Sequence, residues 1–111
     1  VLGEALVDDA GSGPAFVYRV IDALIKGGEA AGLPHNIAAQ LAITMTEGAA
    51  ILAASSSQTP AELAARVTSP GGTTAAGLAV LDSDRALEAL ITQTLRAARD
   101  RGTELAKGDV T

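Results

Sequence analysis

The 111-residue sequence has no cysteine, no tryptophan and a single histidine, His35. Without cysteine the chain has neither a disulfide scaffold nor a cysteine-based zinc site, and one histidine is too few for a histidine metal cluster. Aromatic residues make up only 2% of the chain, as Phe16 and Tyr18. Eight basic residues stand against 13 acidic ones, for a net charge of −5. Nucleic acid is therefore a poor partner, because a basic stripe and base-stacking aromatics are both missing.

Long uncharged runs are also missing. The longest, residues 30–46, is interrupted by Gly32, Pro34 and His35 and falls short of a membrane span. No signal peptide is visible either. We therefore expect a cytoplasmic protein with no membrane partner.

Alanine and other small apolar residues dominate what is present. Hydrophobic residues make up 48% of the chain, and alanine alone about a fifth. Alanine favours helices but removes little apolar area from water, so a core built from one chain would be thin. Glycine and proline divide the sequence into about five helical segments, and no alternating run indicates a sheet. The expected fold is all-α, with helices near residues 14–27, 34–54, 60–67, 75–81 and 82–105 and a frayed tail from residue 107.

Local signals place several helix ends. Ser12 can cap the first long helix, with Pro14 in its first turn. Residues 59–62, Thr-Pro-Ala-Glu, have the spacing of a capping box with proline at the first helical position. Asp82-Ser83-Asp84 has the composition of a cap for the last helix.

The two long helices are apolar on more than one face. In the first, only Arg19, Asp22 and Lys26 form a polar arc, and in the second the only formal charge is Glu47. A monomer of this size cannot cover both helices on all sides, so we expect a partner surface, most simply a second copy in an intertwined homodimer. A compact monomeric bundle is the alternative.

Two glycine-rich segments are candidates for binding chemistry. Gly11-Ser12-Gly13 fails as a dinucleotide loop because no strand precedes it and the third glycine position holds Phe16. The second segment, Ser-Pro-Gly-Gly-Thr-Thr at residues 69–74, opens a helix whose first amides can receive an anion such as a carboxylate. From the pattern alone, an ordinary helix start after a Pro-Gly turn is the favoured interpretation.

A resemblance adds to the carboxylate interpretation. The run Val-Thr-Ser-Pro-Gly-Gly-Thr-Thr-Ala-Ala-Gly-Leu-Ala-Val-Leu-Asp at residues 67–82, with Pro60 and Leu63 before it, resembles the signature of pyrroline-5-carboxylate reductase. Gly-Ser-Gly-Pro-Ala-Phe at residues 11–16, Gly-Leu-Pro at 32–34 and Glu-Leu at 104–105 resemble further segments of that family in the same order.

The resemblance implies that residues 1–111 are the C-terminal helical dimerisation and substrate-binding domain of such a reductase, without its N-terminal Rossmann domain. Members of the family are oxidoreductases that reduce 1-pyrroline-5-carboxylate to L-proline with NAD(P)H, and they form interlocked dimers, often assembled into decamers. The resemblance also implies that the substrate carboxylate binds at a set of loop residues and that Thr74 lies by the reacting imine as the catalytic residue. The implied set is Ser69, Gly71, Gly72, Thr73 and Thr74.

The cofactor would bind outside this chain, so the chain alone is expected to be inactive and to bind neither cofactor nor metal. The preference between NADH and NADPH is not determined by these residues. Two other interpretations stay open: a non-catalytic helical dimer that retains the fold, and the helical domain of a related dehydrogenase.

The sequence departs from the family pattern at four places. Ala10 replaces a serine, Phe16 replaces a tyrosine, and Asp8 and Asp9 stand where small or apolar residues are usual. At residues 82–85, Asp-Ser-Asp-Arg replaces a frequent Gly-Gly turn, where a helix cap is expected to serve equally well.

Overall fold

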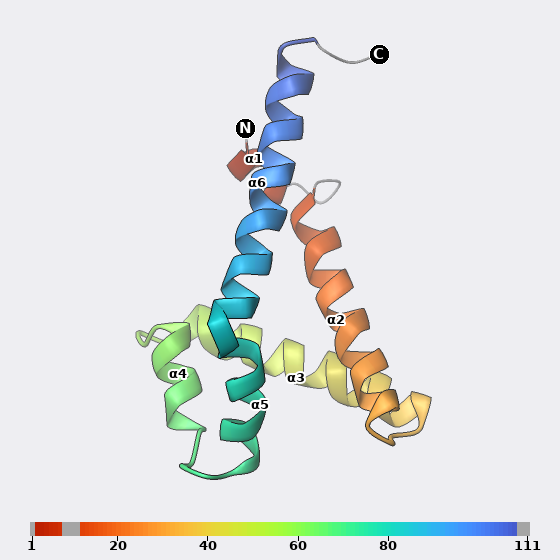
Figure 1. Ribbon diagram of the computed structural model, residues 1–111, viewed down its shortest axis with the longest axis vertical. Coiled ribbons are helices and arrows are strands. Elements are labelled where there is room, and N and C mark those ends of the chain that lie inside the picture. The colour runs from red at the N-terminus through yellow and green to blue at the C-terminus, as the bar shows by residue number, and fades with distance from the viewer. Residues whose placement is uncertain (1, 8–11, 109–111) are drawn as a thin grey trace.

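The computed structural model describes residues 2–7 and 12–108, and these contain six α-helices, one short 3-10 turn and no strand (Figure 1). The all-α prediction is confirmed, and the five expected helices are all present. The sixth helix, α1, was not expected. The helices are α1 (Leu2–Val7), α2 (Ser12–Ala30), α3 (His35–Ser55), α4 (Pro60–Arg66), α5 (Thr73–Asp82) and α6 (Ala86–Ala106).

Helices α2 and α3 form a hairpin closed by a glycine. Gly32 has φ 113°, and the Gly32 and Leu33 amides donate to the carbonyls of Glu29 and Gly28, each at 3.0 Å. This is the Schellman pattern, in which a left-handed residue satisfies the last carbonyls of a helix. The predicted break at residues 32–34 is confirmed.

Small side chains join the two helices of this hairpin. Ala38 and Ala42 on α3, at 1% and 2% exposure, are the only fully buried residues in the described part of the chain. A Cβ added at Gly28 would lie 3.3 Å from the Ala38 Cβ, so glycine permits this close approach. The large side chains of α3 are therefore left on its other faces.

The start of the first long helix tests two sequence predictions. Pro14 lies in the first turn of α2, as expected. Ser12 is the first residue of α2, so it does not occupy the predicted capping position before the helix. Gly11, the residue before it, lies outside the described residues. The departures at Asp8, Asp9 and Ala10 also lie outside them, as do residues 109–111 of the tail.

The short helix α4 is capped at both ends by flanking threonines, Thr59 and Thr68. The Glu62 amide donates to the Thr59 hydroxyl at 3.2 Å and the Thr59 amide donates to the Glu62 carboxylate at 2.9 Å, so the predicted capping box is confirmed. The backbone and side-chain hydrogen bonds with Thr59 hold the pKa of the Glu62 carboxyl below its usual value. At the other end, the Thr68 hydroxyl donates to the Ala64 carbonyl at 2.6 Å.

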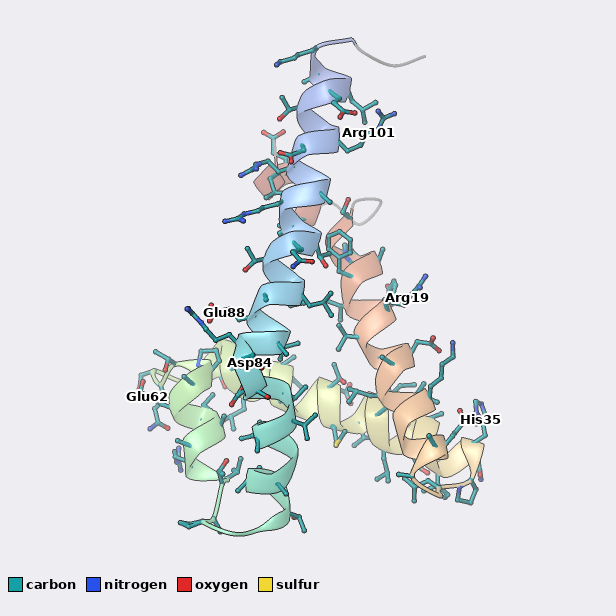
Figure 2. All side chains as sticks on the ribbon, viewed as in Figure 1. Arg19, His35, Glu62, Asp84, Glu88 and Arg101 are labelled. Carbon is teal, nitrogen blue, oxygen red and sulfur yellow. The ribbon has the colours of Figure 1, made fainter. Side chains whose placement is uncertain are left out.

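The junction between α5 and α6 differs from the prediction. Helix α5 continues to Asp82, a 3-10 turn follows at Ser83–Arg85, and α6 begins at Ala86 without a side-chain cap. The expected cap is wrong. Asp84 (φ 52°) and Arg85 (φ 57°) both adopt the left-handed conformation, and these backbone angles, rather than a capping side chain, change the chain direction between α5 and α6. Figure 2 shows Asp84 and Glu88 at this junction, where Arg85 pairs with Glu88 at 2.7 Å.

The helices do not close into a compact bundle. Helix α1 packs against α2 and α6 at one end of the molecule, α2 and α6 then diverge, and α3 crosses towards the other end, where it lies beside α4 (Figure 1). The radius of gyration is 16.7 Å, whereas a compact domain of this length has about 13 Å. The single chain is an open framework, unlike the compact monomeric bundle that the sequence left possible.

Candidate functional site

The candidate site is the loop of residues 69–74, which joins α4 to α5 at the end of the molecule away from α1 (Figure 1). The Gly72 amide donates to the Ser69 carbonyl at 3.0 Å, and Gly71 between them has φ 74°. Proline followed by a left-handed glycine is typical of a type II turn. This glycine has open space around it, so its backbone conformation, not crowding, is what opposes a side chain there.

Gly72 begins α5 from an extended conformation, with φ −87° and ψ −178°, and no side chain caps the helix. Its carbonyl accepts the first helical hydrogen bond, from the Ala76 amide at 3.1 Å. The amides of Thr73, Thr74 and Ala75 precede the first amide that finds an intrahelical acceptor, so their N–H groups point out of the helix end. A Cβ at Gly72 would lie 3.2 Å from the Ser69 carbonyl oxygen, so the turn packs closely on the helix start.

Three hydroxyls surround these amides. Ser69, Thr73 and Thr74 are all exposed, and none of their hydroxyls has a hydrogen-bond partner among the residues that the structure describes. No charged residue occurs between Val67 and Leu81. The positive end of the α5 dipole lies at this segment and favours an anion.

The structure thus brings the predicted site residues together in one continuous segment. The turn and helix start, which the pattern alone favoured, are confirmed at Ser69–Gly72 and Thr73. The amide and hydroxyl donors of this short segment can serve a carboxylate, which accepts several hydrogen bonds. Carboxylate binding itself, and the place of Thr74 beside a reacting imine, stay predictions.

Thr68 is the residue of this region that sequence reasoning missed. Its half-buried hydroxyl bonds back to Ala64 just before the loop begins. The signal was a threonine placed four residues after a helical carbonyl, a spacing that permits such a bond. The same threonine lines a groove of about 510 Å³ between α4 and α5, with Ala61, Ala64, Ala65, Leu78 and Asp82.

The chain offers no cradle for a dinucleotide in its described part. No strand is present there, and the backbone of Gly13 lies directly against the Leu6 carbonyl, inside the contact between α1 and α2. A pyrophosphate needs open amides after a strand. The described residues also contain no group of three or more possible metal ligands.

Among the described residues, one helix qualifies as a membrane span by length and composition. Helix α3 has 21 residues and contains an 18-residue window with a mean hydropathy of 1.5, which corrects the expectation that no apolar stretch is long enough. The uncharged run ends before Glu47, but one carboxylate does not exclude a helix from this class. A core helix of a soluble protein passes the same test, so this is weak evidence for a membrane.

The helical framework and the loop define a class of protein, a helical domain that exposes large apolar faces and presents an anion-accepting helix start. The chain matches the family described as pyrroline-5-carboxylate reductase dimerisation over residues 3–105. The chain therefore belongs to that family, as the resemblance predicted.

Individual relatives are similar over almost the whole chain. A pyrroline-5-carboxylate reductase of Synechocystis sp. is 45% identical over 106 residues, which are 96% of this chain and 39% of the relative. That of Pisum sativum is 43% identical over 102 residues, which are 92% of this chain and 37% of the relative. The chain thus spans about two-fifths of the length of these relatives.

A solved structure shares the fold. The crystal structure of Plasmodium falciparum pyrroline carboxylate reductase with NADP bound matches with a TM-score of 0.80 and 29% identity. The match covers 90% of this chain and 39% of that chain. The similarity therefore concerns one part of a larger protein.

Proposed function

We propose that the chain is the dimerisation and substrate-binding part of a pyrroline-5-carboxylate reductase, an oxidoreductase that reduces 1-pyrroline-5-carboxylate to L-proline with NAD(P)H. The observation that carries the proposal is the loop of residues 69–74, with its type II turn and the outward amides of Thr73 and Thr74. Family membership supports it.

The loop would bind the substrate by its carboxylate. The Thr73 and Thr74 amides and the Ser69 hydroxyl supply donors, and the left-handed Gly71 and the extended Gly72 let the turn bring them together. Fixing the carboxylate orients the ring, so that its C=N bond is presented in one direction for reduction. In this proposal the Thr74 hydroxyl lies next to the imine, where it would orient the nitrogen.

NAD(P)H is assigned to the part of the enzyme outside this chain. The described residues do not fit the cofactor, since they provide neither a strand nor a glycine-rich turn after one. The NADP bound in the Plasmodium falciparum relative supports use of a nicotinamide cofactor by the whole enzyme. The isolated chain should therefore neither bind the cofactor nor catalyse the reaction.

We also propose a homodimer as the functional unit. The chain exposes 8,406 Å², whereas a compact monomer of 11.0 kDa exposes about 5,600 Å². An excess of about 2,800 Å² per protomer, or about 5,600 Å² over two protomers, lies at the upper end of the total area that obligate homodimers bury. Burial of α3 in such an interface would also explain its hydropathy without a membrane.

Three finer points remain part of the proposal. Assembly of dimers into a decamer rests on the family resemblance alone. A cytoplasmic location and the absence of nucleic acid partners rest on the composition and the charge of −5. Sedimentation of the full-length enzyme would separate a dimer from a decamer.

Thr74→Ala in the full-length enzyme tests the site. We expect a loss of about tenfold or more in kcat/KM for 1-pyrroline-5-carboxylate, the scale of a lost hydrogen bond to a charged or reacting group. Thr92→Ala, on α6 and away from the loop, is the matched control. Unchanged steady-state kinetics in a folded Thr74→Ala enzyme would remove Thr74 from the mechanism.

A further inference from the structure

The point where the chain leaves α4 is held by three hydrogen bonds. The Thr68 hydroxyl donates to the Ala64 carbonyl at 2.6 Å, the Val67 amide donates to the same carbonyl at 3.2 Å, and the Thr68 amide donates to the Ala65 carbonyl at 3.2 Å. The hydroxyl bond is the shortest of the three and the only one made by a side chain. Thr68 is half-buried, whereas the loop after it is largely exposed.

The turn that follows is joined directly to Thr68. Ser69 comes next, and its carbonyl is bound by the Gly72 amide at 3.0 Å. A Cβ at Gly72 would also approach the Ser69 side chain at 3.6 Å, so the two residues are packed together. A rotation about the Thr68 backbone would therefore carry the Ser69 hydroxyl and displace Gly72, the residue from which α5 starts.

On its other side this segment faces an open groove. Thr68, Leu78 and Asp82 line this groove of about 510 Å³ between α4 and α5. No hydrogen bond crosses it among the described residues, so the hydrogen bonds that direct the loop out of α4 are those at the end of α4. The Thr68 hydroxyl makes the only one of them that a substitution can remove without changing the backbone.

We propose that Thr68 is a positioning residue for the carboxylate loop. By bonding to Ala64, it sets the place of the Ser69 hydroxyl relative to the Thr73 and Thr74 amides, so that all of them reach one carboxylate. The inference rests on the carboxylate-binding function proposed above and adds a residue that does not itself contact the ligand.

Thr68→Val in the full-length enzyme removes the hydroxyl and keeps the shape of the side chain. Loss of one hydrogen bond predicts an increase of about fivefold in KM for 1-pyrroline-5-carboxylate, with kcat changed less than about twofold because the reacting atoms are not touched. Thr68→Ser retains the hydroxyl and should restore KM. A Thr68→Val enzyme with the KM of the wild type would overturn the proposal.

Thr94→Val is the matched control. The Thr94 hydroxyl also donates to a carbonyl one turn back, that of Leu90 at 2.8 Å, but it lies on α6 away from the loop. A bond that only stabilises the fold would lower the melting temperature in both variants and raise KM in neither. If KM rises equally in both, the effect is general and the positioning role is wrong. Should Thr68→Val not fold, Thr68→Cys, which is similar in size and a weaker donor, is expected to raise KM to an intermediate value.

Amide hydrogen exchange on this chain separates the two proposals. We expect exchange at the Gly72 amide, which is bonded to the Ser69 carbonyl, to be faster in Thr68→Val than in the wild type and unchanged in Thr94→Val. If the wild-type full-length enzyme does not reduce 1-pyrroline-5-carboxylate, the proposed function fails while this exchange difference still stands. If the enzyme is active but neither exchange nor KM responds to Thr68→Val, the positioning role alone is overturned.

Discussion

Two regions of this chain are stabilised in different ways. The segment from Thr59 to Thr74 forms its own structure by local hydrogen bonds: a capping box, the bond from Thr68 to Ala64, and the Ser69–Gly72 turn. Helices α2 and α3 bury only Ala38 and Ala42 among the described residues and expose large apolar side chains on their other faces. The loop is thus built within one protomer, whereas in the proposed homodimer a second copy would complete the core that supports the domain.

Exposed side chains locate the surface that needs a partner. Tyr18 is 69% exposed and Val80 74%, values unusual for a set of this size in a monomer. The set spans most of the helices. It includes Val17, Val20 and Leu24 on α2, Ile37, Leu41, Ile43, Met45, Ile51 and Leu52 on α3, and Leu87, Leu90, Ile91 and Leu105 on α6.

The largest effect is expected from a charge on the apolar face. Leu24→Asp or Leu41→Asp should weaken the dimer by at least about 3 kcal/mol, more than a hundredfold in its dissociation constant, because a buried carboxylate would lack a partner. Sedimentation measures the change. Arg19→Asp, in the polar arc of α2, is the control and should have little effect, since Arg19 makes no ion pair among the described residues. If Arg19→Asp weakened the dimer as much as Leu24→Asp or Leu41→Asp, the distinction between the polar arc and the apolar face would be wrong.

A smaller effect of opposite sign is expected at the α5–α6 junction. Arg85→Gly should raise the free energy of unfolding by about 0.5–1 kcal/mol, because glycine adopts φ 57° without the steric cost that other residues carry. Arg85→Ala removes the exposed Arg85–Glu88 pair without relieving the backbone, so it should give no gain. Chemical denaturation at a fixed protomer concentration measures both. A gain in both variants would show that the left-handed conformation is not the cause.

The smallest effect concerns the pH dependence of the capping box formed by Thr59 and Glu62 at the start of α4. The lowered pKa of Glu62 means that its contribution to stability is full above its unfolded-state pKa and is lost as the pH falls through the lower folded value. Glu62→Gln can still form the capping box but does not titrate. As the pH is lowered from about 5 to about 2, the melting temperature should therefore fall less steeply in Glu62→Gln than in the wild type. Parallel curves would contradict this account of the box.

Local signals predicted much of this structure. The capping box at Thr59–Glu62, the break at Gly32 and the turn at Pro70–Gly71 each depend on a few neighbouring residues whose chemistry fixes the backbone. The interpretation of residues 69–74 as a site needed the family resemblance as well, because an ordinary helix start has the same pattern.

The features that were missed depend on contacts or on uncommon backbone conformations. Aspartate adopts the left-handed conformation more often than most residues, but arginine does not, so the sequence does not signal two successive left-handed residues at Asp84 and Arg85. Helix α1 is only six residues long, and its packing on α2 and α6 is a tertiary effect. Among many alanines, the sequence also does not single out Ala38 and Ala42 as the two that α2 covers.

The most direct test of the central claim is sedimentation equilibrium of this chain at micromolar concentration. A core completed by a second copy predicts a dimer of about twice 11.0 kDa, with a melting temperature that rises with protomer concentration. A stable, folded monomer whose melting temperature does not change with concentration would contradict the claim.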